Sequence, residues 1–159
     1  GGAIMSELWD IYDENRNKTG KRVERGNAKF EKGEFHIVVS AIIMNSKNEI
    51  LISQRAPHKK HPLKWECNGG AIRKGEDEIS GILREIYEEL GIVLTKEEAI
   101  FLKTIKKNHH FKTIFLFKMD IKIEDIKFID KEVVDAKWVS IDEFMNIFNI
   151  FLFWFCNLH

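Results

Sequence analysis

The sequence predicts a single α/β domain of the α+β type, because several strand-like segments surround one strongly amphipathic helix. The chain has 159 residues, of which 44% are hydrophobic and 31% charged, as in a globular domain with a full core. Its 25 Lys and Arg residues balance 25 Asp and Glu residues, so the basic excess typical of dedicated nucleic-acid binders is absent. We therefore expect one domain over residues 5–159 and no nucleic-acid partner.

The ends of the chain and its cysteines bear on its location. Residues 1–4 precede Met5 and are expected to be a remnant added before the natural start. No basic segment followed by an apolar one opens the chain, which disfavours secretion. Cys67 and Cys156 have the spacing of neither a metal-ligand pair nor a disulfide framework, so a reducing, cytoplasmic setting is the simplest interpretation.

Strand patterns dominate the first part of the chain. Residues 7–20 alternate apolar and polar side chains and end in turn-forming residues, which predicts a strand, a turn and a second short strand. Residues 35–44 are apolar and β-branched, and after a polar turn the pattern resumes at 49–53, so a hairpin is expected. Residues 55–75 contain two prolines and three glycines and are expected to form a loop.

The clearest helix is expected from about Asp77 to Leu90, with Gly91 ending it. Its apolar residues recur at helical spacing: Ile79, Ile82, Leu83, Ile86 and Leu90. Further strands are expected at 101–106, 112–119 and 133–139. Ser140 can then cap a helix that begins near Ile141.

An aromatic run at residues 147–155 ends this pattern. It is too short to span a bilayer, which needs about 20 apolar residues, and it lacks the basic face of an interfacial helix. No membrane partner is therefore expected. The run is interpreted as a helix packed on the core or in an oligomer interface, which would make a homodimer, with a reading-frame artefact as the second interpretation.

Three carboxylates share one face of the expected helix. At about 100° per residue, Glu85, Glu88 and Glu89 lie close together, and Gly81 on the same face is expected to leave room for an approaching group. Carboxylates so placed repel one another, and the hard cations Mg²⁺ and Mn²⁺ prefer such oxygen ligands. An acidic helix face alone is usually only solvated surface, so the surrounding sequence has to decide.

The surrounding sequence resembles the Nudix family. Residues 70–92 read Gly70-Ala-Ile-Arg-Lys-Gly-Glu76, then seven residues, then Arg84-Glu-Ile-Tyr-Glu-Glu-Leu-Gly-Ile92, which matches every position of the Nudix box. The resemblance implies an α/β/α sandwich with a mixed central sheet, in which the box forms a loop–helix–loop. It also implies divalent-metal-dependent hydrolysis of a diphosphate linkage by water attack on phosphorus. The small-molecule substrate would be a nucleoside-diphosphate derivative or a related organic diphosphate, and the cofactor Mg²⁺ or Mn²⁺.

The resemblance assigns catalytic or metal-binding roles to Glu85, Glu88, Glu89, Arg84, Gly70 and Glu132. In the family, the three helix acids and the carbonyl oxygen matching that of Gly70 bind metal, and the Arg matching Arg84 holds the first acid. Glu85 is a frequent candidate for the general base, whereas Glu76 is expected to organise the loop. Glu132 is interpreted either as a further metal ligand or base from a loop, or as a surface charge.

A second resemblance is to the branch of the family related to isopentenyl-diphosphate isomerase. It rests on residues 8–13 and on five further short matches: Thr19-Gly20, Arg25-Gly26, Phe35-His36, Gln54-Arg55 and the Pro62-x-x-Trp65 element. It implies that Arg55 and Lys59 bind the substrate diphosphate, although both could be loop charges. It also offers His36 as a metal ligand, against the interpretation as a packed strand histidine.

Two departures from these relatives matter. The isomerases use a Cys in a Cys-x-His-Pro context, which is missing here, so Cys67 is interpreted as a small, partly buried residue. Asn68 replaces the Pro that commonly precedes the Gly-Gly pair, which leaves the local turn in doubt. Three tryptophans, Trp9, Trp65 and Trp138, are expected in the core, and His109 and His110 either at the surface or lining the pocket. Two alternatives to hydrolysis stay open: isomerisation of an allylic diphosphate, and a non-catalytic ligand-sensing or interaction module.

Overall fold

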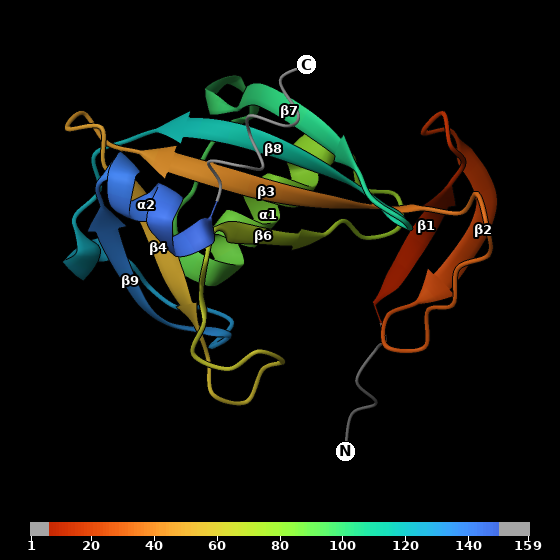
Figure 1. Cartoon of the computed structure of the whole chain (residues 1–159), viewed down its shortest axis with the longest axis horizontal. Helices are drawn as coiled ribbons and strands as arrows, with labels where there is room; N and C mark the ends of the chain where they lie inside the picture. The colour runs from red at the N-terminus through yellow and green to blue at the C-terminus, as the bar shows by residue number, and fades with distance from the viewer. Residues whose placement is uncertain (1–6, 150–159) are drawn as a thin grey trace.

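The computed structural model describes residues 7–149, which form a small hairpin and a larger α/β/α sandwich (Figure 1). The elements in chain order are β1 (Leu8–Tyr12), β2 (Lys18–Glu24), β3 (His36–Met44), β4 (Ile50–Arg55), β5 (Trp65–Glu66), β6 (Asn68–Ala71), α1 (Glu78–Leu90), the 3₁₀ turn η1 (Lys96–Glu98), β7 (Ile100–Lys106), β8 (His110–Lys118), the 3₁₀ turn η2 (Ile123–Asp125), β9 (Val133–Val139) and α2 (Ile141–Phe148). The first two strands pair with each other, and the other seven form one mixed sheet. The expected sandwich with a mixed central sheet is confirmed.

Strand β3 lies at the centre of this sheet. It pairs in parallel with β8, from His36 opposite His110 onward, and antiparallel with β6, from Val38 opposite Ala71. Alternate side chains of a strand point to opposite faces. Those of Val39 and its odd-numbered neighbours pack in the core beneath α1, whereas Ile42 packs in a second cluster with α2.

Two expectations about the strands need correction. The hairpin expected over residues 35–53 exists only at its turn, where Met44 faces Ile50, because β4 then leaves β3 and pairs with β9 and β5. The loop expected over residues 55–75 contains β5 and β6. A Cβ atom on Gly69 would lie 2.1 Å from the carbonyl oxygen of Val39. Gly69 is therefore needed for the close approach of two strands. The glycine and proline content of residues 55–75 had suggested a loop instead.

The expected helix is confirmed as α1. Asp77 caps it by accepting a 2.7 Å hydrogen bond from the backbone N–H of Ser80, and Gly91 ends it in the left-handed conformation. The role expected for Gly81 is wrong. A Cβ atom there would lie 2.5 Å from the Cγ2 atom of Ile72, so the space beside Gly81 is filled by the loop that precedes the helix.

The β1–β2 hairpin lies at one end of the sandwich (Figure 1) and is fixed to the loop before α1. The backbone N–H of Lys74 donates to the carbonyl oxygen of Leu8 at 2.8 Å, and that of Gly75 donates to Oδ2 of Asp10 at 2.8 Å. Asp10 is buried and also accepts a hydrogen bond from Arg22 of β2. The hairpin is thus joined to the loop before α1 by backbone as well as side-chain contacts.

Helix α2 covers the face of the sheet opposite α1. Ser140 caps it by accepting a hydrogen bond from the backbone N–H of Glu143 at 3.1 Å, and Phe144 is buried against Ile50, Ile52 and Val139. Neither helix within residues 7–149 has the length and hydrophobicity that a bilayer span requires. Of the aromatic run expected to pack as a helix, residues 147–148 end α2 and residues 150–155 lie outside the described part of the chain.

Candidate active site

A polar pocket of about 490 Å³ lies where four parts of the chain meet. The β1–β2 hairpin contributes Glu7, Trp9 and Arg25, and the loop before β9 contributes Asp130 and Glu132. The remaining lining comes from Lys59, from β6 with the loop after it, and from α1: Gly69, Gly70, Ala71, Arg73, Arg84, Glu85 and Glu88. Most residues singled out in the sequence therefore come together here.

Arg84 is the central cation among the acids of α1. Its Nη1 atom lies 3.0 Å from Oε1 of Glu85 and 3.2 Å from Oε2 of Glu88. On its other side, its Nε and Nη2 atoms donate to both carboxylate oxygens of Glu76 at 2.6 and 3.0 Å. Glu76 also accepts a hydrogen bond from the backbone N–H of Arg73 at 2.7 Å. Arg84 thus fixes two acids of the pocket. Through Glu76, it also connects the helix to the loop that precedes it.

Glu89 is buried beside this pocket and has polar partners for both oxygens. Oε1 accepts from the backbone N–H of Gly69 at 3.0 Å, and Oε2 accepts from the side-chain amide of Asn68 at 3.3 Å. Asn68 is itself buried and its amide also donates to Oγ of Ser53 at 2.9 Å. Sequence analysis treated Asn68 only as a departure from Pro and missed this contact, because Ser53 and Glu89 are distant in the chain.

The electrostatics of the acids favour a bound cation. Burial raises the pKa of Glu85 to about 7, and the neighbouring Glu88 acts in the same direction while Arg84 opposes it. Burial, followed by the charge of Glu85, also raises the pKa of Glu89 well above its usual value. Carboxylates gathered in this way have too little positive charge around them, which a divalent cation with oxygen ligands supplies.

Gly70 of β6 lies beside the first acid of α1. Gly70 lies so close to Glu85 that a Cβ atom on it would be 2.6 Å from Oε1 of that residue. Within residues 7–149, no three His, Cys, Asp or Glu side chains are already spaced to hold a metal ion, and Arg84 bridges Glu85 and Glu88 instead. The donor types fit Mg²⁺ or Mn²⁺, which prefer carboxylate and carbonyl oxygen ligands.

The loop before β9 adds two acids. Glu132 forms a 3.0 Å ion pair with Nζ of Lys59, and its carbonyl oxygen accepts from the backbone N–H of Ala56 at 2.9 Å. Asp130 was not singled out in the sequence, yet it lines the pocket and its backbone N–H donates to the carbonyl oxygen of Glu88 at 2.9 Å. Burial raises the pKa of Asp130, and Glu132 and Glu88 add to this shift.

Of the two basic residues expected to bind substrate, Lys59 lines the pocket and Arg55 does not. Arg55 forms hydrogen bonds from Nη1 to both oxygens of Glu66, at 2.9 and 3.1 Å, and from Nε to the carbonyl oxygen of Lys60 at 2.7 Å. Arg55 therefore braces the loop that carries Lys59.

His36 lies in an aromatic stack outside the pocket lining. Its ring is 4.2 Å from that of Trp9 and 5.1 Å from that of Phe30, centroid to centroid. Burial lowers the pKa of His36 to about 4, and the nearby His110 and His109 contribute. This placement agrees with the packed-histidine interpretation. Trp9 was expected in the core, and it both packs on His36 and lines the pocket.

A second pocket, of about 600 Å³, lies on the α2 side of the sheet. Cys67 is among its lining residues, and burial raises the pKa of its thiol to about 12, so the thiol stays protonated. His109 stacks on Phe30 and lies within hydrogen-bonding distance of the carbonyl oxygen of Glu34, at 3.0 Å. Neither His109 nor His110 is among the residues lining the polar pocket.

The other two tryptophans are partly buried. The ring of Trp65 lies beneath Nζ of Lys137, which is 4.4 Å from its centroid. The Nε1–H of Trp138 donates to the carbonyl oxygen of Ile121 at 3.1 Å. Both tryptophans thus pack against other parts of the protein, and neither lines the polar pocket.

Comparison with known proteins gives consistent matches. The family model of the NUDIX domain matches residues 34–152 of this chain. An uncharacterized Nudix hydrolase of Listeria monocytogenes is 34% identical over 143 residues, which are 86% of this chain and 82% of that protein. An isopentenyl-diphosphate Delta-isomerase of Photorhabdus laumondii is 34% identical over 106 residues, which are 65% of this chain and 59% of the isomerase.

Among solved structures, the protein DR0079 of Deinococcus radiodurans is similar with a TM-score of 0.75. The match covers 91% of this chain and 90% of that one, at 20% sequence identity. At this identity the likeness supports the fold and says nothing of substrate.

Proposed function

The chain belongs to the Nudix hydrolase family, and from this premise we propose that it hydrolyses a diphosphate linkage with the help of Mg²⁺ or Mn²⁺. The substrate would be a nucleoside-diphosphate derivative or a related organic diphosphate. The observation that carries the proposal is the joint placement of Glu85 and Glu88 beside Gly70 in one polar pocket. The complete set of acids favours this function over a module that only senses a ligand.

The residues that would hold the metal are Glu85, Glu88 and Glu89, the carbonyl oxygen of Gly70, and Glu132 from the opposite loop. When bound, the metal supplies charge neutralisation of the diphosphate and a lowered pKa for water. Arg84 orients Glu85 and Glu88 through its guanidinium group. Glu85 is our candidate for the base that accepts the proton of the attacking water.

Lys59 would bind the substrate diphosphate directly, since it lies in the pocket beside Glu132. Arg55 would hold the loop of Lys59 in place, because Arg55 donates a hydrogen bond to the carbonyl oxygen of Lys60. Its assignment as a direct substrate ligand would require it to leave Glu66, with which it forms two hydrogen bonds.

Glu85→Gln and Glu88→Gln test the proposal. A glutamine keeps the size of the side chain and removes its charge, so each variant should lose turnover by about a hundredfold or more while keeping its circular dichroism spectrum. Tyr87→Phe is a matched control, because Tyr87 lies on the same helix and is exposed. Equal hydrolysis in wild type and both glutamine variants, across nucleotide, sugar, dinucleotide and isoprenoid diphosphates, would contradict the proposal.

Isomerisation of an allylic diphosphate is the second candidate, favoured by the similarity to the Photorhabdus isomerase. The position of Cys67 weighs against it, since this thiol lines the other pocket rather than the acidic one. Incubation with isopentenyl diphosphate separates the two reactions. Released phosphate or diphosphate indicates hydrolysis, whereas an isomeric product without release indicates isomerisation.

A further inference from the structure

The N-terminal hairpin contributes to the acidic pocket although it lies outside the segment that the NUDIX domain model matches. The match begins at residue 34, whereas Glu7, Trp9 and Arg25 line the pocket. The loop contacts of Leu8 and Asp10 hold the hairpin against residues 73–75. These three side chains therefore come to the pocket from a segment outside residues 70–92.

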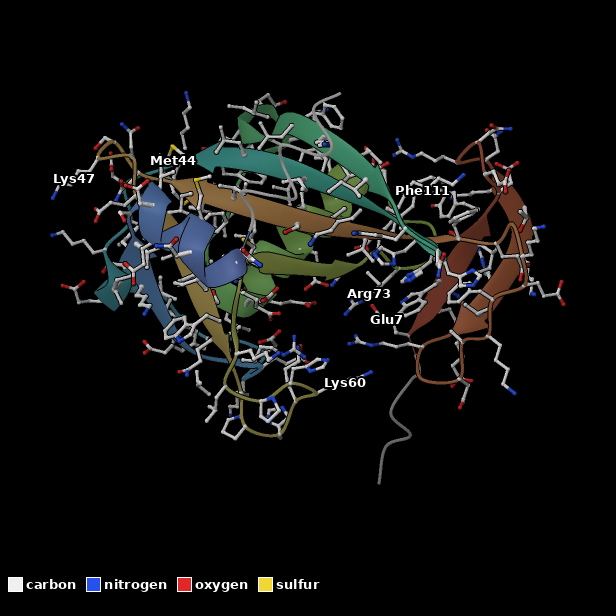
Figure 2. The ribbon with its side chains drawn as sticks, in the orientation of Figure 1. Glu7, Met44, Lys47, Lys60, Arg73 and Phe111 are labelled. Atoms are coloured by element: carbon white, nitrogen blue, oxygen red, sulfur yellow. The ribbon has the colours of Figure 1, made fainter. Side chains whose placement is uncertain are left out.

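Glu7 bridges two arginines at the rim of this pocket. Its Oε2 atom lies 2.7 Å from Nη1 of Arg25, and its Oε1 atom lies 3.2 Å from Nε of Arg73. Glu7 and Arg73 face each other between the hairpin and the body of the protein in Figure 2. The backbone N–H of Arg25 also donates to the carbonyl oxygen of Glu7 at 2.8 Å. Both guanidinium groups are thus fixed by one carboxylate.

The two arginines differ in exposure from the other cations of the pocket. The side chains of Arg84 and Lys59 are 16% and 18% exposed, and each is held by acids of the pocket. Those of Arg25 and Arg73 are 57% and 46% exposed. Arg73 also reaches the pocket acids, with Nη2 3.4 Å from Oε1 of Glu88. Arg25 and Arg73 therefore offer guanidinium surface to an incoming ligand.

Arg25 lines the same pocket as the acids Glu85 and Glu132. The hydrogen bond with Glu7 raises the pKa of Arg25, and the charges of Glu132 and Glu85 act in the same direction. A diphosphate entering between these acids would meet strong repulsion on one side. Cations at the hairpin side would offset this repulsion independently of a metal.

We propose that Arg25 and Arg73, positioned by Glu7, form a binding site for the diphosphate group of the substrate on the hairpin side of the pocket. This inference rests on the proposed function, because it concerns the substrate of that same site. A guanidinium group binds two phosphate oxygens at once through its planar fork, and Glu7 holds the forks in place before the ligand arrives. Such preorganisation reduces the entropy lost on binding.

The binding experiment uses imidodiphosphate, a diphosphate analogue that resists hydrolysis, with calorimetric titration of the full chain in Mg²⁺. Arg25→Gln and Arg73→Gln should each weaken binding about tenfold, equivalent to about 1.4 kcal/mol. Lys21→Gln is the control, because it removes a cation from the same hairpin that pairs with Glu34 outside the pocket. Its dissociation constant should stay within about twofold of wild type.

Turnover adds a readout that a structural role would not give. Arg25→Gln should raise KM about tenfold with little change in kcat, because it removes binding energy common to substrate and transition state. Arg25→Lys should restore part of the affinity, since it returns the charge without the fork. If Arg25→Gln does not fold, Arg25→Lys and Glu7→Gln carry the test, with Glu7→Gln also expected to raise KM.

Unchanged imidodiphosphate binding and KM in folded variants of Arg25 and Arg73 would overturn this inference while leaving hydrolysis intact. Failure of the proposed function has a different signature: no diphosphate is hydrolysed, and Glu85→Gln behaves as wild type. Weakened analogue binding in Arg25→Gln and Arg73→Gln, with binding kept in Lys21→Gln, would support the inference whether or not the protein hydrolyses a diphosphate.

Discussion

Asn68 donates its side-chain amide to Oε2 of Glu89 across 3.3 Å, while the backbone N–H of the next residue, Gly69, donates to Oε1 at 3.0 Å. Both oxygens of a buried acid are therefore held by two consecutive residues of β6. Ser53 of β4 holds the amide in turn, as its Oγ accepts from Nδ2 at 2.9 Å and donates to Oδ1 at 3.2 Å. A second strand, β4, thus helps to orient an acid on the helix.

Replacing Asn68 with Ala should weaken Mn²⁺ binding by roughly tenfold or more, because partners that orient a metal ligand commonly contribute 10- to 100-fold in affinity. The affinity can be followed by electron paramagnetic resonance of free Mn²⁺. Asn146→Ala, at an exposed position on α2, is the control and should bind as wild type. Equal affinity in Asn68→Ala and wild type would show that Glu89 needs no such orientation.

Removal of divalent metal should lower the melting temperature. Buried acids with raised pKa values repel one another in the metal-free protein, and a ligand present at about 100 times its dissociation constant stabilises the folded state by about 2.7 kcal/mol. Thermal unfolding in EDTA and in Mg²⁺ measures the difference. The same comparison in Glu85→Gln should give a much smaller shift, and an equal shift in both proteins would place the stabilising metal elsewhere.

Gly81→Ala should destabilise the protein by about 1–2 kcal/mol, although alanine is normally the better helix former. The new methyl group would meet Ile72, which is buried and 2.5 Å from the ideal Cβ position. Urea unfolding gives the free energy. In the double variant with Ile72→Ala the clash is relieved, so the two changes should not be additive. Additive effects would contradict the close contact.

Acid should destabilise the fold through His36. Its pKa is about 4 in the folded protein and 6.5 ordinarily, so the unfolded chain takes up a proton first as the pH falls. The contribution of His36 to the free energy of unfolding is complete above pH 6.5 and is lost as the pH falls towards 4. At pH 4.5 the loss should be on the order of 2 kcal/mol, after allowance for partial exposure.

His36→Phe is the matched variant for this prediction, because it keeps a ring between Trp9 and Phe30 without a titrating group. Urea unfolding at several values between pH 7 and pH 4.5 should give a shallower decline for the variant than for wild type. His109 and His110 face the same ring and stay in both proteins. Parallel declines would assign the pH dependence to other groups.

Sequence patterns predicted those parts of the site that are local in the chain. Glu85 and Glu88 lie one turn apart on a single helix, so their shared face follows from helical periodicity alone. The box around them also carried the family resemblance. In the same way, the limits of β9 and the Ser140 cap were predicted from short-range signals, and both are confirmed.

The rest depends on contacts between distant residues. Strand β6 was missed because a glycine-rich segment has low strand propensity, and only its pairing with β3 makes it a strand. Glu7 and Arg25 could not be placed in the pocket, because nothing in residues 7–26 indicates where the hairpin docks. Gly81 was placed on the correct face of α1, but the sequence did not reveal that Ile72 fills the space beside it.

The parallel pairing of β3 with β8 has a consequence for how the protein folds. It brings His36 beside His110, and the segment between them holds the whole Nudix box, residues 70–92. Helix α1 can begin to form from local contacts, but Gly69 and Asn68 reach Glu89 only when β6 lies on β3. Contacts that close long stretches of chain form slowly. During refolding, recovery of activity should therefore follow completion of the sheet and lag behind the return of helical structure.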